Sequence, residues 1–243
     1  MTNICKLAKT LAVATLCMAL SPSWAQKAGD LILSVGAAYM KPNASLGPTT
    51  STGAVPAAAA NFNAVLAGGS ANIKGSSTET LGAFYMWTDQ IATELTIGIP
   101  PKMTVDVTLT GGAHPGAATA KVINPSLVAK YLFNNPGDQI RPYAGIGVSD
   151  VSFTSVQANT AGDALVGQLA GTSSSLSSSW APVFNAGVVY NFDEKWSLNS
   201  SISYVPLKTN VNFVSSAATG NTVTTGVLTV NPWDLVIRIG YKF

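Results

Sequence analysis

The most constraining feature of this sequence is its last segment, which runs from Trp233 to Phe243 and reads WDLVIRIGYKF. Apolar and aromatic residues alternate with charged or small ones, so an extended strand would have one wholly apolar face and one face with all three charges. The segment has the length of a tilted β-strand that crosses a bilayer, which needs about 9–11 residues. We therefore interpret it as the closing strand of a transmembrane β-barrel, which requires an even number of strands in all.

The beginning of the chain has the pattern of an export signal. Two lysines precede an apolar run at 11–20, and Ser23-Trp24-Ala25 offers a small-x-small cleavage site. The apolar run is too short to cross a membrane as a helix. We predict a cleaved secretory signal peptide at 1–25, followed by a single outer-membrane β-barrel domain at 26–243.

Composition supports this interpretation once the signal peptide is set aside. Cys5 and Cys17 both lie in the signal peptide, so the mature chain has no disulfide, thiolate metal site or cysteine nucleophile. Charged residues are only 10% of the chain, against about 25% in soluble domains. No basic patch for nucleic acid is present, and no mature stretch is apolar enough for a membrane helix. An exported, apolar chain without such a helix is typical of a barrel in the bacterial outer membrane.

The alternating pattern recurs often enough to close a barrel. We predict eight antiparallel strands, at 31–40, 78–87, 91–99, 125–133, 140–153, 180–192, 196–207 and 233–243. The connections between them alternate long and short, which is typical of long extracellular loops and short periplasmic turns. Aromatic residues gather at both ends of the strands, where the two interfaces of a membrane are expected. A secreted β-sandwich with the same pattern remains the alternative.

The parity of the strands places their charges inside the barrel, where we expect Glu94, Lys130, Arg141, Asp234, Arg238 and Lys242. A Lys or Arg facing lipid at mid-bilayer would cost about 2–4 kcal/mol. An eight-stranded barrel has an interior that side chains nearly fill, so a water-filled porin channel is not expected.

Several short motifs, in order and with their spacing, resemble the OmpW family. These are Thr88-Asp89, Pro100-Pro101-Lys102, Arg141-Pro142-Tyr143 with Gly145-Ile146-Gly147, Trp180 to Pro182, Ala186-Gly187, Trp196-Ser197-Leu198-Asn199, Asn231-Pro232-Trp233 and Gly240-Tyr241-Lys242-Phe243. The segment 204–209 is similar to the AlkL-type alkane importers of that family. The resemblance implies passive uptake of small hydrophobic molecules through an apolar channel, with release sideways into the membrane.

Two interpretations apply to the inward charges Glu94, Lys130, Arg141, Arg238 and Lys242. They form either a polar plug that closes the lower barrel and diverts solute sideways, or ordinary salt bridges within the lumen. The two interpretations are compatible with each other. Since the third and fourth predicted strands are neighbours, we expect Glu94 to pair with Lys130.

Four further residues are candidates for the solute path. Phe84 and Met86 have inward parity on the second strand, where they either line an apolar passage or fill the core. Pro100 and Pro101 remove two backbone donors at the outer end of the third strand. They either terminate the strand or open a lateral gap in the barrel wall.

Catalysis is not expected, because the one histidine, His114, lies in a Gly/Ala/Pro-rich connection without an evident partner. We predict that it is a solvated loop residue, and we expect no metal and no cofactor. The expected partners are outer-membrane lipid, a small hydrophobic solute, and the barrel-assembly machinery through the C-terminal strand. A structural or host-interacting protein whose loops bind a partner remains the alternative function, and an outer-membrane enzyme is a third.

Overall fold

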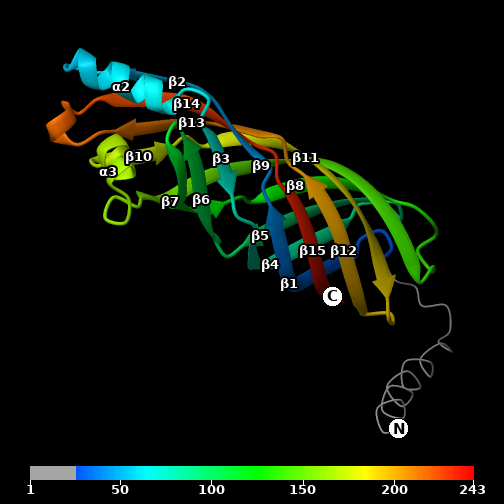
Figure 1. Cartoon of the computed structure of the whole chain (residues 1–243). Helices are drawn as coiled ribbons and strands as arrows, with labels where there is room; N and C mark the ends of the chain where they lie inside the picture. Colours follow the sequence, from blue (N-terminus) through cyan, green and yellow to red (C-terminus); the bar gives the residue numbers. More distant parts are fainter. Residues whose placement is uncertain (1–25) are drawn as a thin grey trace, which may run out of the picture.

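The computed structural model describes residues 26–243, and the predicted signal peptide at 1–25 lies outside the described residues. Eight strands form the wall of a barrel, and further strands and helices extend it at one end (Figure 1). The wall strands are β1 (Leu31–Lys41), β4 (Ser76–Met86), β5 (Ile91–Gly98), β8 (Ser126–Leu132), β9 (Ile140–Ala158), β11 (Ser179–Asn191), β12 (Trp196–Tyr204) and β15 (Trp233–Lys242).

The wall is a closed antiparallel sheet. Its order is β11-β12-β15-β1-β4-β5-β8-β9, and pairing of β9 with β11 completes the ring. The first and last strands are neighbours, with Val35 opposite Ile239. The predicted eight-stranded barrel is therefore confirmed. In six of the eight strands the observed ends lie within two residues of the predicted ones. The fifth strand continues to Ala158, and the seventh ends at Tyr204.

Side chains alternate between the two faces of the wall as the period of two predicts. Val35 and Ile146 on the outer face are 57% and 61% exposed, whereas Met86 and Arg141 on the inner face are fully buried. Aromatic rings gather on the outer face at the end with short turns, where Tyr85 and Trp87 form one of several edge-to-face pairs. The apolar outer face is the surface that lipid covers in a membrane.

The predicted long loops form an ordered extension of the barrel. Its strands are β2 (Ala44–Thr52), β3 (Ser70–Ile73), β6 (Lys102–Leu109), β7 (Gly112–Ile123), β10 (Ser173–Leu176), β13 (Leu207–Val214) and β14 (Val223–Val230). They make two sheets, β3-β6-β7-β9 and β10-β13-β14-β2. The long strand β9 belongs to both the wall and the extension, so the two parts form one continuous structure.

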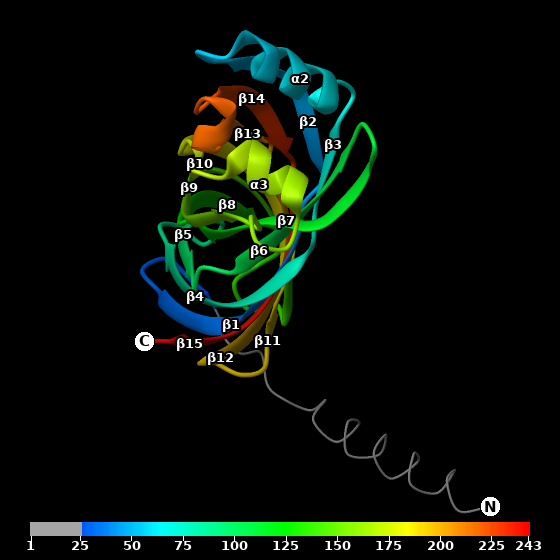
Figure 2. The ribbon, with the colours of Figure 1, turned by 60° about the vertical axis from the view of Figure 1, so that its left-hand side comes forward.

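Two helices cover the outer end of the extension (Figure 2). These are α2 (Pro56–Leu66) and α3 (Ala164–Ala170), and a 3₁₀ turn lies at Ala217–Thr219. Phe62 and Leu66 of α2 pack with Leu169 of α3 and Leu109 of β6 in one apolar cluster. No helix within residues 26–243 is long and apolar enough to cross a membrane.

Candidate functional site

Three charged side chains meet across the middle of the barrel lumen. Glu94 of β5 bonds Lys130 of the neighbouring β8 through Oε2. Its Oε1 accepts a hydrogen bond from Arg238 Nη2 of β15 at 2.5 Å. All three residues are 3% exposed or less. The expected Glu94–Lys130 pair is thus present, and we call the three side chains the charged floor.

The charged floor contains two cations and one anion, and buried charges of this kind need additional partners. Arg238 Nη1 donates to Thr96 Oγ1 at 3.0 Å. Lys130 Nζ lies 4.2 Å from the centroid of the Tyr143 ring, within the range of a cation–π interaction. The hydroxyl and the ring therefore help to compensate the second positive charge.

Arg238 reaches Glu94 across two intervening strands, β1 and β4. Each of these strands carries a glycine beneath the guanidinium or its stem. A Cβ on Gly82 would lie 2.9 Å from Arg238 Nη1, and a Cβ on Gly36 would lie 2.9 Å from Arg238 Cγ. The charged floor therefore depends on the absence of side chains at these two positions.

Phe84 and Met86 belong to an apolar cluster on the inner face of the wall. Met86 is fully buried and Phe84 is 4% exposed, and both pack with Ile32, Leu132 and neighbouring side chains. Neither residue lines the cavities that lie above the charged floor. Of the two interpretations of this pair, the geometry agrees with a core-filling role.

Arg141 and Lys242 lie apart from the charged floor, in contact with the segment that precedes β1. Arg141 donates to the backbone carbonyls of Gln26 and Asp89, and Lys242 pairs with Asp30 at 3.4 Å. The five inward charges therefore do not form one plug. Three make the charged floor, and two fasten the N-terminal segment to the barrel.

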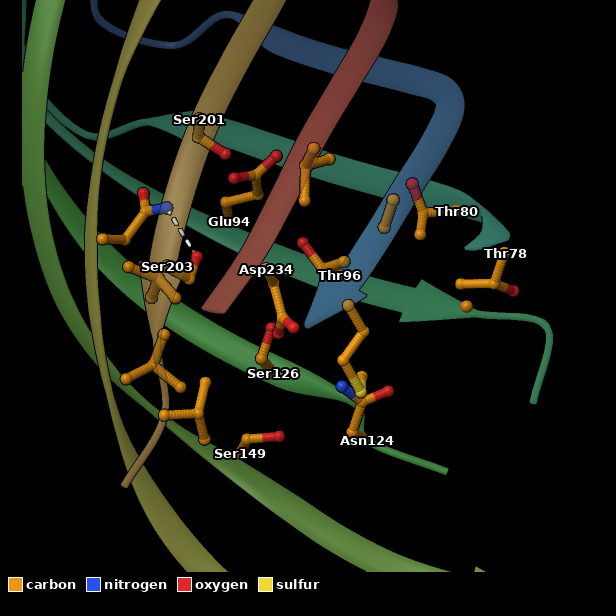
Figure 3. A pocket seen from close by; sticks show the side chains of 18 of the residues that line it. Thr78, Thr80, Glu94, Thr96, Asn124, Ser126, Ser149, Ser201, Ser203 and Asp234 are labelled. Carbon is orange, nitrogen blue, oxygen red and sulfur yellow. Dashed lines mark hydrogen bonds between the residues drawn. The ribbon is translucent and has the colours of Figure 1, made fainter. Parts of the chain in front are cut away.

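Three adjoining cavities lead from the helices to the charged floor. The upper cavity lies in the extension and includes Leu66 of α2 and Leu169 of α3 in its lining. The middle cavity is lined mainly by apolar residues where the extension meets the wall. The lower cavity reaches Glu94 (Figure 3). Arg238 also lines this cavity.

The chemistry of the lining changes along this path. Leu228 lines both the upper and the middle cavity, and Val205 lines both the middle and the lower one. The upper and middle cavities are almost entirely apolar, with Val107, Met103 and Val122 among their residues. The lower cavity is rich in hydroxyl groups, from Thr78, Thr80, Thr96, Ser126, Ser149, Ser201 and Ser203.

The barrel wall is interrupted beside the lower cavity. The β5–β8 ladder ends at the pair Thr96–Ser126, and the next backbone bond across this junction joins Val122 N to Pro101 O at 3.2 Å. Pro100, Pro101 and Pro125 have no N–H to donate in the intervening stretch. Ile97, Ile99 and Ile123, which border this wall break, are 48%, 62% and 36% exposed.

The prediction of a solvated, unpartnered His114 is wrong. His114 lies in β7, and its Nδ1 is 2.5 Å from Asp163 Oδ2, with side chains only 15% and 21% exposed. The other Asp163 oxygen accepts from the backbone N–H groups of Leu165 and Val166 at the start of α3. This contact joins two connections far apart in sequence. The position of Asp163 before an apolar run is typical of a helix N-cap, but nothing in the sequence pointed to its contact with His114.

The His114–Asp163 contact fastens α3 to the β6–β7 hairpin. The hydrogen bond with His114, followed by the bond from Val166 N, holds the pKa of the Asp163 carboxyl below its usual value. His114 Nε2 is buried without a partner in the described part of the chain, so no hydroxyl nucleophile is bonded to it there.

Comparison with known proteins places these features in a family context. The family model described as "OmpW family" matches residues 27–243. Outer membrane protein W of Vibrio cholerae is 28% identical over 99% of both chains. Outer membrane protein AlkL of Ectopseudomonas oleovorans is 24% identical over 71% of this chain and 68% of its own length. The crystal structure of OprG from Pseudomonas aeruginosa superimposes with a TM-score of 0.76 at 25% identity, covering 91% of this chain and 99% of OprG.

Proposed function

This chain belongs to the OmpW family of outer-membrane β-barrels, and on that premise we propose that it is a passive channel for small hydrophobic molecules, which it releases sideways into the membrane. One observation carries the proposal. An apolar path through the extension ends above a closed charged floor and beside the wall break.

The upper and middle cavities supply the driving force for entry. Burying apolar surface is favourable by about 25 cal/mol per Å², so an apolar solute gains free energy when it leaves water for these cavities. The extension continues beyond the apolar outer face of the wall. In the proposed orientation it stands in the polar lipopolysaccharide layer, which a hydrophobic solute must cross. It thus offers such a solute an apolar route through that layer.

The charged floor prevents the solute from continuing straight into the periplasm. A neutral apolar molecule would have to separate Glu94 from Lys130 or Arg238 and would offer no charge in return. Breaking a buried ion pair in this way costs about 3–5 kcal/mol. Sideways release avoids this cost.

The wall break provides the exit. Gly98 and Ser126 line the lower cavity and flank the point where the β5–β8 ladder ends. A solute that passes between them breaks no ladder hydrogen bond, and the exposed isoleucines on the rim form an apolar path to lipid. By contrast, the β12–β15 and β15–β1 junctions carry ladders along their whole length, so a solute would have to break several backbone hydrogen bonds to open either of them.

Uptake of a radiolabelled alkane tests this function. Cells that express the protein should take up dodecane several times faster than cells without it, with no dependence on metabolic energy. Equal rates in the two strains would refute the transport proposal.

A proline variant tests the exit separately. Replacing Pro100 and Pro101 by alanine restores two N–H donors and allows β5 to continue its ladder. We expect dodecane uptake to fall several-fold. The matched control is Pro142→Ala, a proline in the wall near the short turns that stands opposite Val188 in β11 and should leave uptake unchanged. Wild-type uptake by the double variant would exclude this exit.

A further inference from the structure

Buried polar atoms without partners gather around the lower cavity. Within the described chain, Thr80 Oγ1, Asn185 Oδ1, Asp234 Oδ1 and Arg238 Nε are buried and make no hydrogen bond, and all four residues line this cavity. Leaving a buried polar atom unpaired destabilises a protein, so such atoms normally have a partner. Their concentration around one cavity indicates a place where a polar group binds.

Asp234 has the most informative position of the four. It lines both the middle and the lower cavity, so it stands where the apolar lining gives way to hydroxyl groups. Its neighbours across the ladders are Ser203 of β12 and Met40 of β1, one polar and one apolar. In Figure 3 the Asp234 side chain projects into the space bordered by Thr96 and Ser126.

The unpartnered atoms define the chemistry of the missing group. The amide nitrogen of Asn185 donates to Ser203 Oγ at 2.9 Å, which leaves its Oδ1 as an acceptor. Asp234 Oδ1 is a second acceptor. These two acceptors require a ligand with an O–H or N–H donor, whereas Arg238 Nε and Thr80 Oγ1 carry hydrogens that the oxygen of an alcohol can accept. A bare hydrocarbon offers neither kind of group.

The cavity above defines the remainder of the ligand. Met103, Val122, Leu207 and Val230 give the middle cavity an aliphatic lining directly above Asp234. A ligand that occupies both cavities therefore has an aliphatic tail and a donor-bearing head.

We propose that the junction of the middle and lower cavities is a binding site for an aliphatic amphiphile, a primary alcohol or amine, whose head donates to Asp234. This proposal rests on the proposed function, since it identifies a class of cargo for the same path. The alcohol and the amine share the donor chemistry, and the experiment separates them.

The test is equilibrium binding of 1-dodecanol, dodecylamine and dodecane to the purified full-length protein in lipid nanodiscs, with empty nanodiscs as the blank for partition into lipid. Asp234→Leu should weaken binding of the alcohol or the amine about 10-fold, the effect of one lost hydrogen bond. Dodecane binding should change less than about twofold, because dodecane donates no hydrogen bond. Asp234→Asn retains an acceptor oxygen without the charge, so it should preserve alcohol binding and weaken amine binding.

Asp150→Leu is the matched control, because Asp150 of β9 lines none of the three cavities. A similar loss for all three ligands, or no loss for any, would overturn the proposal and leave water as the partner of these atoms. Urea unfolding of each variant shows whether the barrel is intact. Specific binding of 1-dodecanol by a protein that does not accelerate dodecane uptake would refute the channel and retain the site.

Discussion

The charged floor makes a quantitative prediction for Glu94→Gln. This substitution preserves the size of the side chain but leaves Lys130 and Arg238 as two buried cations without an anion. Removing one partner of a buried ion pair costs about 3–5 kcal/mol, because the remaining charge stays desolvated. The glutamine amide also places a donor against side chains that are themselves donors. We therefore expect a loss of about 3–5 kcal/mol in the free energy of unfolding.

The assay is urea unfolding of the protein refolded into lipid vesicles, followed by tryptophan fluorescence. Glu194→Gln, in the exposed short turn between β11 and β12, is the control and should change stability by less than about 0.5 kcal/mol. A triple variant with Glu94→Leu, Lys130→Met and Arg238→Met should recover most of the loss, because apolar residues of similar size often replace a buried ion network without cost. A loss below about 1 kcal/mol for Glu94→Gln would refute the argument that the floor is held by charge pairing.

Three further predictions follow from contacts elsewhere in the molecule. Gly82→Ala should destabilise the barrel by about 1–3 kcal/mol in the same assay, because the new Cβ would lie 2.5 Å from Ser34 Oγ and 2.9 Å from Arg238 Nη1. The pKa of Asp163 is lower in the folded protein than the unfolded-state pKa of about 4. The stability that Asp163 gives to the α3 contact is therefore fully present above about pH 4 and is lost as the pH falls through the folded-state pKa. Pepsin cleavage of α3 should therefore rise as the pH falls below about 4 in the wild type, and Asp163→Ala should be cleaved at every acid pH tested. Arg141→Ala removes the hydrogen bond to the Gln26 carbonyl, so the segment at Gln26 should become susceptible to exopeptidase digestion. The far-UV circular dichroism spectrum of the barrel should not change.

The wall of the barrel was predictable because lipid and lumen impose opposite requirements on alternate residues. Ile237 and Arg238 are neighbours in sequence, yet one is half exposed to lipid and the other is buried. The Glu94–Lys130 pair followed from the adjacency of their strands. The contact of Arg238 with Glu94 could not be predicted in this way, because β15 and β5 are not neighbouring strands. Their contact depends on the curvature of the barrel and on the glycine at position 82.

The extension was not predictable because the two faces of its strands differ little in hydrophobicity. Its strands are rich in Ala, Ser, Thr and Gly, as in β2, so their alternation has little contrast. The His114–Asp163 contact joins two such segments, and no local pattern in either one specifies the other. Asp234 was placed on the inner face by parity, but its position between two cavities depends on where the extension narrows.

The proposed role of the charged floor has a consequence for the electrical and osmotic state of the cell envelope. An ion that crossed this lumen would have to exchange its hydration shell for a site already occupied by Glu94, Lys130 and Arg238. A porin with a continuous water column conducts salt whenever it is open. Under the proposed function the ion pairs close the lumen, and many copies in the outer membrane are then expected to leave the Donnan potential and the exclusion of polar antibiotics unchanged.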